Sequence, residues 1–248
     1  MRYFIELSYQ GTAYHGWQVQ PNASSVQEML NEALSTLLRE SINIVGAGRT
    51  DAGVHAEQMY AHFDLDRQLD TQELSQRLNA FLPEDIVVHR VFKVADETHA
   101  RFDAISRSYE YRIWLGRNPF TTRTTWQLYN QELDLVQMNA AGAVLKEFSD
   151  FQCFSKSKTD VKTYNCSITR AEWKQEGASL IFHISADRFL RNMVRAIVGT
   201  LIDVGAGKLT KEDVIAIIKS KDRSKAGFSV PAQGLFLTQV LYPKELLT

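Results

Sequence analysis

The order of periodic segments in the first part of the chain restricts the possible folds more than any other feature of the sequence. Residues 2–9 alternate between apolar and polar side chains, which is the period of a β-strand. Apolar residues then recur at helical spacing from Ser25 to Glu40, and Ser25 and Glu28 have capping-box spacing. The pattern further predicts strands at 41–45, 59–65 and 86–94 and a helix at 71–82. This β-α-β-β-α-β order is that of the split βαβ, or ferredoxin-like, arrangement.

The second part of the chain predicts another mixed unit. The expected elements are a strand at 109–115, a helix at 133–148, strands at 164–173 and 180–185, helices at 188–204 and 211–219, and a strand at 235–241. We therefore expect an α+β fold class with two domains, 1–105 and 106–248. Two such halves could pack sheet edge to sheet edge and form a cleft, and clefts between domains are common places for binding and catalysis.

The composition is that of a folded protein without a membrane segment. The 248 residues are 44% hydrophobic and 23% charged, which excludes intrinsically disordered and collagen-like classes. No apolar stretch approaches the roughly 18 residues of a membrane helix, and the first residues lack the pattern of a signal peptide. Cys153 and Cys166 form no Cys-x-x-Cys pair, which disfavours a zinc site or a disulfide framework and favours a reducing compartment. We expect a cytoplasmic protein with no membrane contact.

Charge is distributed unevenly along a chain whose net charge is −1. Residues 1–105 hold 8 Lys and Arg against 15 Asp and Glu, whereas residues 106–248 hold 20 against 14. An asymmetry of this kind suggests contact with nucleic acid, although an ordinary solvated surface can have the same excess. The charge distribution by itself leaves both interpretations open, contact with nucleic acid and an ordinary solvated surface.

The glycine-rich segment Gly46–Ala56, GAGRTDAGVHA, is the most informative stretch of the sequence. It is no phosphate-binding P-loop, because Gly-Lys-Ser/Thr is absent, and its glycine spacing differs from the dinucleotide fingerprint. What remains is a turn that holds Arg49 and Asp51 two residues apart. A carboxylate in such a turn can act as nucleophile, base or ion-pair partner. It could equally cap the next turn while Arg49 lies on the surface.

Several motifs together resemble the TruA family of tRNA pseudouridine synthases. They are the loop just described, YQGTAYHGWQ at 9–18, Val26-Gln27, LNAFLP at 78–83, His99–Phe102 with Tyr109-Glu110-Tyr111, FLRNMVRAIVG at 189–199 and PAQGLFL at 231–237. The resemblance extends from Tyr3 to Leu241. One departure is Gln10, which stands where the family usually has Asp. This position lies outside the glycine-rich loop.

The resemblance implies roles for four residues. Asp51 matches the catalytic aspartate, and Arg195 matches the arginine that pairs with it. Tyr109 matches the tyrosine that contacts the target base, and Arg49 matches an arginine that assists extrusion of the nucleotide. The implied reaction isomerises uridine without a redox change, so neither a cofactor nor a metal is expected. The apolar periodicity around Arg195 predicts a buried helix, in which an arginine needs a partner.

The resemblance also implies a substrate and an assembly. The expected substrates are uridines at positions 38, 39 and 40 in the tRNA anticodon stem-loop. The expected fold is two RRM-like halves whose antiparallel sheets join around a central active-site cleft, in a homodimer. Two alternatives remain: a non-catalytic tRNA-binding or chaperone protein of the same fold, and a synthase that acts on another RNA site.

Residues without an assigned chemical step receive structural interpretations. Arg188 and Arg191 would lie on one helical stripe with Arg195 and could face solvent or phosphates. The basic residues Lys156, Lys158 and Lys162 could meet phosphates or form a solvated cluster. His55 is expected to be a structural histidine, and both cysteines are expected to be packing residues.

Overall fold

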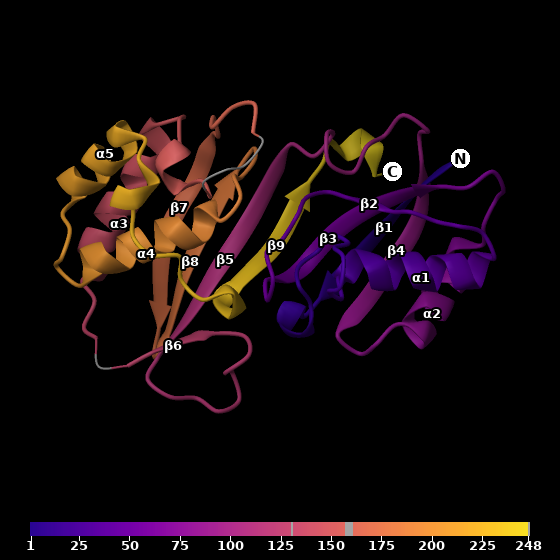
Figure 1. The fold of residues 1–248 in the computed structure, drawn as a ribbon, viewed down its shortest axis with the longest axis horizontal. Coiled ribbons are helices and arrows are strands. Elements are labelled where there is room, and N and C mark those ends of the chain that lie inside the picture. The colour runs from indigo at the N-terminus through magenta and orange to yellow at the C-terminus, as the bar shows by residue number, and fades with distance from the viewer. Residues whose placement is uncertain (130, 157–160, 248) are drawn as a thin grey trace. The chain divides into compact units, whose positions relative to one another are not determined.

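The computed structural model describes residues 1–129, 131–156 and 161–247, and the chain divides into two compact units. Unit 1 comprises Met1–Ser106 and Leu237–Thr248, and unit 2 comprises Arg107–Phe236. Both units are mixed α/β with mostly antiparallel strands (Figure 1). No helix in the described residues is long and apolar enough to cross a membrane.

Unit 1 has the predicted order of elements. Strand β1 lies between β3 and β4 and is antiparallel to both, and α1 and α2 cover one face of this sheet (Figure 1). The last part of β9 also belongs to unit 1, where the Val240 N–H donates to the side chain of Gln58. The elements are β1 (Arg2–Tyr9), α1 (Val26–Leu38), β2 (Val45–Gly46), β3 (His55–Asp64), α2 (Thr71–Phe81), β4 (Ile86–Val94) and β9 (Leu235–Leu241).

The alternation in β1 is confirmed, with one addition. Tyr3, Ile5, Leu7 and Tyr9 are all buried, as a one-sided apolar strand requires. Phe4 is fully buried as well, because rings from β3 and β4 and the ring of Tyr242 surround it on the other side. The sheet of unit 1 therefore buries apolar groups on both faces near the start of β1.

The strand predicted at 41–45 is wrong, since only Val45 and Gly46 pair with β3. The preceding backbone donors are taken by side chains of α1: Ile42 N–H donates to Ser35 Oγ, and Ile44 N–H donates to Asn31 Oδ1. The capping box at the start of α1 is confirmed, because Ser25 and Glu28 exchange both hydrogen bonds. β3 begins at His55, four residues earlier than predicted, so it starts directly behind the glycine-rich loop.

In unit 2 a three-stranded antiparallel core has the order β5-β8-β7, and β6 pairs parallel with β5. Helix α3 packs on β7, where the side chain of Asn139 bonds the backbone of Trp173 in both directions. Helix α4 is buried over most of its length. The elements are β5 (Ser106–Leu115), β6 (Trp126–Leu128), α3 (Leu135–Val144), β7 (Ile168–Glu176), β8 (Ser179–Ala186), α4 (Met193–Gly205) and α5 (Lys211–Ser220).

Two predicted boundaries in unit 2 are wrong for identifiable reasons. β7 begins at Ile168 rather than at 164, because residues 164–166 pair with 149–151 instead, through Phe151 N–H to Tyr164 O and Cys166 N–H to Ser149 O. α4 begins at Met193 rather than at Arg188, because Asn192 has a left-handed backbone conformation with φ of 68°. Arg188, Arg191 and Arg195 therefore do not form a helical stripe.

Candidate active site

The loop between β2 and β3 carries Arg49 and Asp51, and the segment after β1 holds it in place. Trp17 N–H donates to Thr50 O at 3.3 Å, and Gly53 N–H donates to Tyr14 O at 3.2 Å. The hydroxyls of Tyr9 and Thr50 are 2.9 Å apart. Backbone groups on both sides of Asp51 are thus tied to residues 9–17, which the sequence analysis singled out as a motif.

Two glycines of that segment allow the close approach. A Cβ on Gly16 would lie 2.4 Å from Thr50 O and 3.1 Å from the carbonyl carbon of Asp51. A Cβ on Gly11 would lie 2.0 Å from Val54 O. Gly16 also has a φ of +95°, which L side chains rarely adopt. The loop can therefore sit directly on the backbone of residues 11–16 only because these positions have no side chain.

His55 supports the same contact from the other end of the loop. Its side chain is fully buried, and its Nδ1 accepts a hydrogen bond of 3.0 Å from Gly11 N–H. The prediction of a structural histidine is confirmed. Trp17 is buried too, and a Cβ on Gly46 would collide with its indole ring, so the start of the loop is packed as tightly as its end.

The two charged residues of the loop differ in exposure. Asp51 is half-buried, and its carbonyl accepts a hydrogen bond from Val54 N–H, which closes the turn. Arg49 is exposed. A carboxylate on a half-buried turn can be held in one orientation toward a substrate. An exposed guanidinium on a long side chain can contact groups farther from the loop.

A neighbouring hydrogen bond anchors the segment that clamps the loop. Tyr14 is buried, and its hydroxyl donates to Asp85 Oδ1 at 2.6 Å. Burial, and then the adjacent Asp85 carboxylate, raise the pKa of Tyr14, so its hydroxyl stays protonated as the donor. The segment 9–17 is therefore bound to Asp85, which directly precedes β4, as well as being continuous with β1.

Tyr109 lies on β5 in unit 2 and is half-buried. The ring of Phe189 meets it edge to face, with the ring centroids 5.1 Å apart. This contact fixes the plane of the tyrosine and leaves part of its surface accessible. Phe189 has no role expected from the sequence, although it lies in the motif FLRNMVRAIVG.

Arg195 lies in the first turn of α4 and is half-buried. Its Nε donates to Val230 O at 2.7 Å, and the next residue's carbonyl, that of Pro231, accepts from the hydroxyl of Tyr111 at 2.8 Å. Burial raises the pKa of Tyr111, and the charge of Arg195 opposes that rise. The carbonyl of Val230 thus orients the guanidinium of Arg195.

The four predicted residues are divided between the units. Asp51 and Arg49 belong to unit 1, and Tyr109 and Arg195 belong to unit 2. The pairing of Asp51 with Arg195 stays a prediction. Within the described residues no group of three or more His, Cys, Asp or Glu side chains could hold a metal ion.

The two cysteines are packing residues, as predicted. Both are buried, and burial raises the pKa of each thiol to about 12. A thiol with such a pKa is protonated near neutral pH and is a poor nucleophile.

The chain matches known proteins over almost its whole length. Residues 7–103 and 148–243 match the family described as tRNA pseudouridine synthase. The chain is 53% identical to tRNA pseudouridine synthase A of Bacteroides thetaiotaomicron over 250 residues, which cover 100% of this chain and 93% of the relative. The identity is 52% with the Porphyromonas gingivalis protein of the same name, over 99% and 98% of the two chains, and 39% with that of Bacillus licheniformis, over 98% and 99%.

These matches define an RNA-modifying isomerase. The chain belongs to the tRNA pseudouridine synthase family, the enzymes that convert uridine to pseudouridine in tRNA. The family resemblance and the enzyme class expected from the sequence are confirmed.

Proposed function

We propose that this chain converts uridine to pseudouridine at positions 38, 39 and 40 in the anticodon stem-loop of tRNA, with Asp51 as the catalytic residue and without a cofactor. The observation that carries the proposal is the loop 46–56, which holds Asp51 half-buried on a backbone tied at Thr50 and Gly53 to the segment 9–17. Carboxylate chemistry of this kind requires a fixed geometry, because a small misplacement of a reacting group costs much of the rate.

The reaction needs a base or nucleophile and little else from the protein. The bond from N1 to C1′ breaks, the base turns, C5 bonds to C1′, and the proton of C5 passes to water while N1 gains a proton. No electrons are gained or lost, so the substrate and one carboxylate suffice. Asp51 can attack the sugar or the base, or it can remove the C2′ proton to give a glycal.

The other three residues serve the same step in this proposal. Arg195 pairs with Asp51 and keeps the carboxylate ionised through its opposite charge. Tyr109 contacts the target base with its ring, whose plane Phe189 fixes. Arg49, exposed on the loop, fills the stack that the extruded nucleotide leaves, which offsets part of the few kcal/mol that extrusion costs.

The proposal includes an assembly. Units 1 and 2 act as two RRM-like, ferredoxin-like halves whose sheets join, and the substrate enters a cleft between them. Two copies form a homodimer that binds one tRNA, in the cytoplasm. The presence of Asp51, Tyr109 and Arg195 at the matching positions favours an enzyme over a tRNA-binding protein without catalysis.

Release of tritium tests the proposal directly. Unmodified tRNA carrying tritium at C5 of its uridines is incubated with the wild-type protein and with Asp51→Asn, which keeps the shape and removes the carboxylate. We expect release by the wild-type protein and none by the variant, and mapping of the product then tests positions 38–40. Release by both proteins would remove Asp51 from the mechanism. Binding of tRNA without release by either would support the non-catalytic alternative or another RNA target.

A further inference from the structure

Basic residues of unit 2 lie on and next to the short segment from Asp150 to Lys156. Lys221 Nζ lies 2.7 Å from Asp150 Oδ2, at one end of the segment. At the other end Lys156 N–H donates to Arg191 O at 3.0 Å. The segment thus links the end of α5 with the turn before α4. We call this set the basic surface; it consists of Lys156, Arg188, Arg191, Lys221, Arg223 and Lys225.

A shared hydroxyl joins the two sides of the basic surface directly. Asn192 Nδ2 donates to Ser229 Oγ at 2.6 Å, and Arg223 Nη2 lies 3.0 Å from the same oxygen. Arg223 also donates to the carbonyl of Gly227. Arg191, which precedes Asn192, and Arg223 are therefore held on a common framework, although they are far apart in the sequence.

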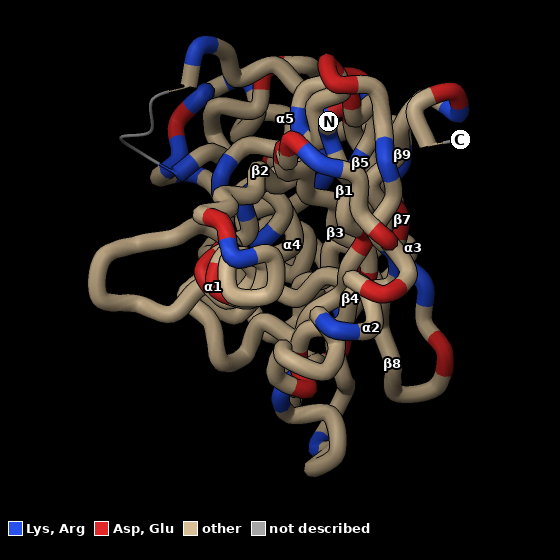
Figure 2. Tube along the Cα trace, turned by 90° about the vertical axis from the view of Figure 1, so that its right-hand side faces the viewer, with Lys and Arg blue, Asp and Glu red and all other residues tan. Residues whose placement is uncertain are grey.

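The carboxylates that the structure describes in this region have partners within unit 2. Asp150 is paired with Lys221, and the Lys221 ammonium contributes to lowering the pKa of Asp150. Asp187 Oδ1 accepts from the backbone of Ser167 and Arg188, and Asp222 Oδ1 accepts from Ser224. Among the described residues, the six cations of the basic surface outnumber these three carboxylates. Figure 2 marks Lys and Arg along the trace in blue and Asp and Glu in red.

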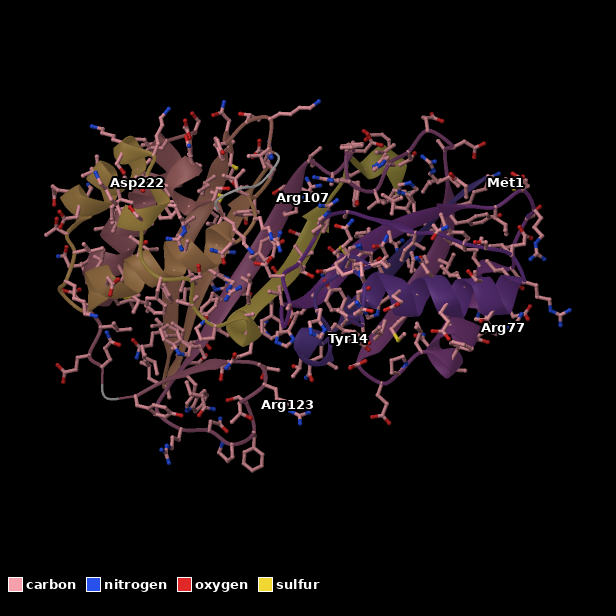
Figure 3. All side chains as sticks on the ribbon, viewed as in Figure 1. Met1, Tyr14, Arg77, Arg107, Arg123 and Asp222 are labelled. Carbon is pink, nitrogen blue, oxygen red and sulfur yellow. The ribbon has the colours of Figure 1, made fainter. Side chains whose placement is uncertain are left out.

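The position of the basic surface relates it to the target nucleotide. Phe189, which packs on Tyr109, directly follows Arg188. Arg195 follows Arg191 by four residues, in the first turn of α4. Figure 3 shows the side chains of this unit around β5 and α4. The residues proposed to contact the target base are thus continuous in the chain with the basic surface.

We propose that the basic surface binds the phosphate backbone of tRNA beside the target nucleotide, and that Arg188 and Arg191 make the principal contacts. The inference rests on the proposed function and adds to it the residues that hold the substrate. A guanidinium matches a phosphate group with two parallel hydrogen bonds, which suits arginine to this task. Arg188 and Arg191 are the members of the surface next in sequence to Phe189 and to the first turn of α4, whereas Lys221 is paired with Asp150 and Arg223 donates to backbone carbonyls.

The test measures tRNA binding over a range of salt concentrations in Asp51→Asn protein, so that no turnover interferes. The double variant Arg188→Gln, Arg191→Gln is compared with the matched control Arg170→Gln, Lys174→Gln, which removes the same charge from exposed residues of β7. Loss of two phosphate contacts lowers the slope of log affinity against log salt by about 1.4–1.8 and weakens binding about tenfold or more near 0.1 M salt. The control is expected to keep the wild-type slope.

Further measurements separate binding from folding and from catalysis. The variant Arg188→Lys, Arg191→Lys keeps the charges and is expected to restore most of the salt slope. With Asp51 intact, KM for tRNA is expected to rise more than kcat falls in the glutamine variant. Denaturation curves verify that all variants are folded.

The possible results separate this inference from the proposed function. An unchanged salt slope in the glutamine variant overturns the inference, and so does an equal loss in the control. If tRNA binding depends on Arg188 and Arg191 but the wild-type protein releases no tritium, the proposed reaction fails and the basic surface stands. If the wild-type protein releases tritium and the slope is unchanged, the reaction stands and the basic surface fails.

Discussion

Gly16→Ala is a sensitive test of how the loop that carries Asp51 is held. The new Cβ would lie 2.4 Å from Thr50 O, whereas real Cβ contacts below 3.0 Å essentially never occur. Since Thr50 O belongs to the backbone rather than to a flexible side chain, the loop has to move by at least about 0.6 Å at Thr50. Asp51 is the next residue, so its carboxylate moves as well.

The structure sets the expected magnitudes. A non-glycine residue in the left-handed region costs about 1–2 kcal/mol, and forcing a methyl group into packed atoms costs about 1–3 kcal/mol. We therefore expect the free energy of unfolding to fall by about 2–4 kcal/mol. A displacement of nearly 1 Å at a reacting group can lower the rate about 100-fold, and we expect a fall in kcat of that order in the protein that remains folded.

Two glycines of the same chain provide matched controls. A Cβ on Gly48, in the same loop, would meet no atom within 4 Å, so Gly48→Ala tests substitution without a collision. Gly116 has a φ of +111° and the same open surroundings, so Gly116→Ala tests backbone strain without a collision. Tritium release gives kcat for the three variants, and denaturant titration gives their free energies of unfolding.

Only Gly16→Ala should lose most of its kcat, while Gly116→Ala should lose stability and keep its activity. If folded Gly16→Ala protein works at the rate of Gly48→Ala, then the contact with Thr50 does not position Asp51, and the argument from the clamped loop fails.

Three further predictions concern stability. Burial, with smaller contributions from neighbouring charges, lowers the pKa of His62 to about 4, so the unfolded chain binds the proton first as pH falls. The free energy of unfolding should therefore fall by about 3 kcal/mol as pH decreases from about 6.5 to 4, and denaturation of His62→Asn should show a flatter pH dependence. Ser25→Ala breaks the capping box with Glu28 and should cost about 1 kcal/mol in the same assay, with no loss of kcat. Asn79 bonds both backbone groups of Val88, so Asn79→Asp, which places an acceptor against the carbonyl, should cost about 1–3 kcal/mol of unfolding free energy; an unchanged value would contradict the pairing.

Local periodicity predicted most elements of the fold and failed where side chains competed for the backbone. The alternation in β1 and the capping box of α1 act between residues close in sequence, so they were visible there. Residues 41–44 do not form the expected strand, because the side chains of Ser35 and Asn31 accept the hydrogen bonds of their backbone N–H groups. The helix expected from Arg188 starts at Met193 because Asn192 adopts a left-handed conformation that apolar spacing does not reveal.

In the candidate site, too, the sequence predicted the residues with unusual local patterns but not their partners from distant segments. The glycine-rich loop and Asp51 were identified from the sequence, because their residue types are unusual at that spacing. The partners of the loop were not, since Thr50 is held by Trp17 and Tyr9 from a separate segment of the chain. The role of Phe189 was missed for the same reason, because only the folded chain sets its ring against Tyr109 on β5.

The sequence by itself determined the order of elements in unit 1, the motif that contains Asp51 and the family resemblance, because each depends on residue types at short spacing. The tertiary structure alone decided that Gly16 lies on the backbone of Thr50, that Arg195 is oriented by the carbonyl of Val230, and that one basic surface gathers Lys156, Arg191 and Arg223. These contacts join residues tens of positions apart, and their geometry follows from packing, which no local pattern of side chains encodes.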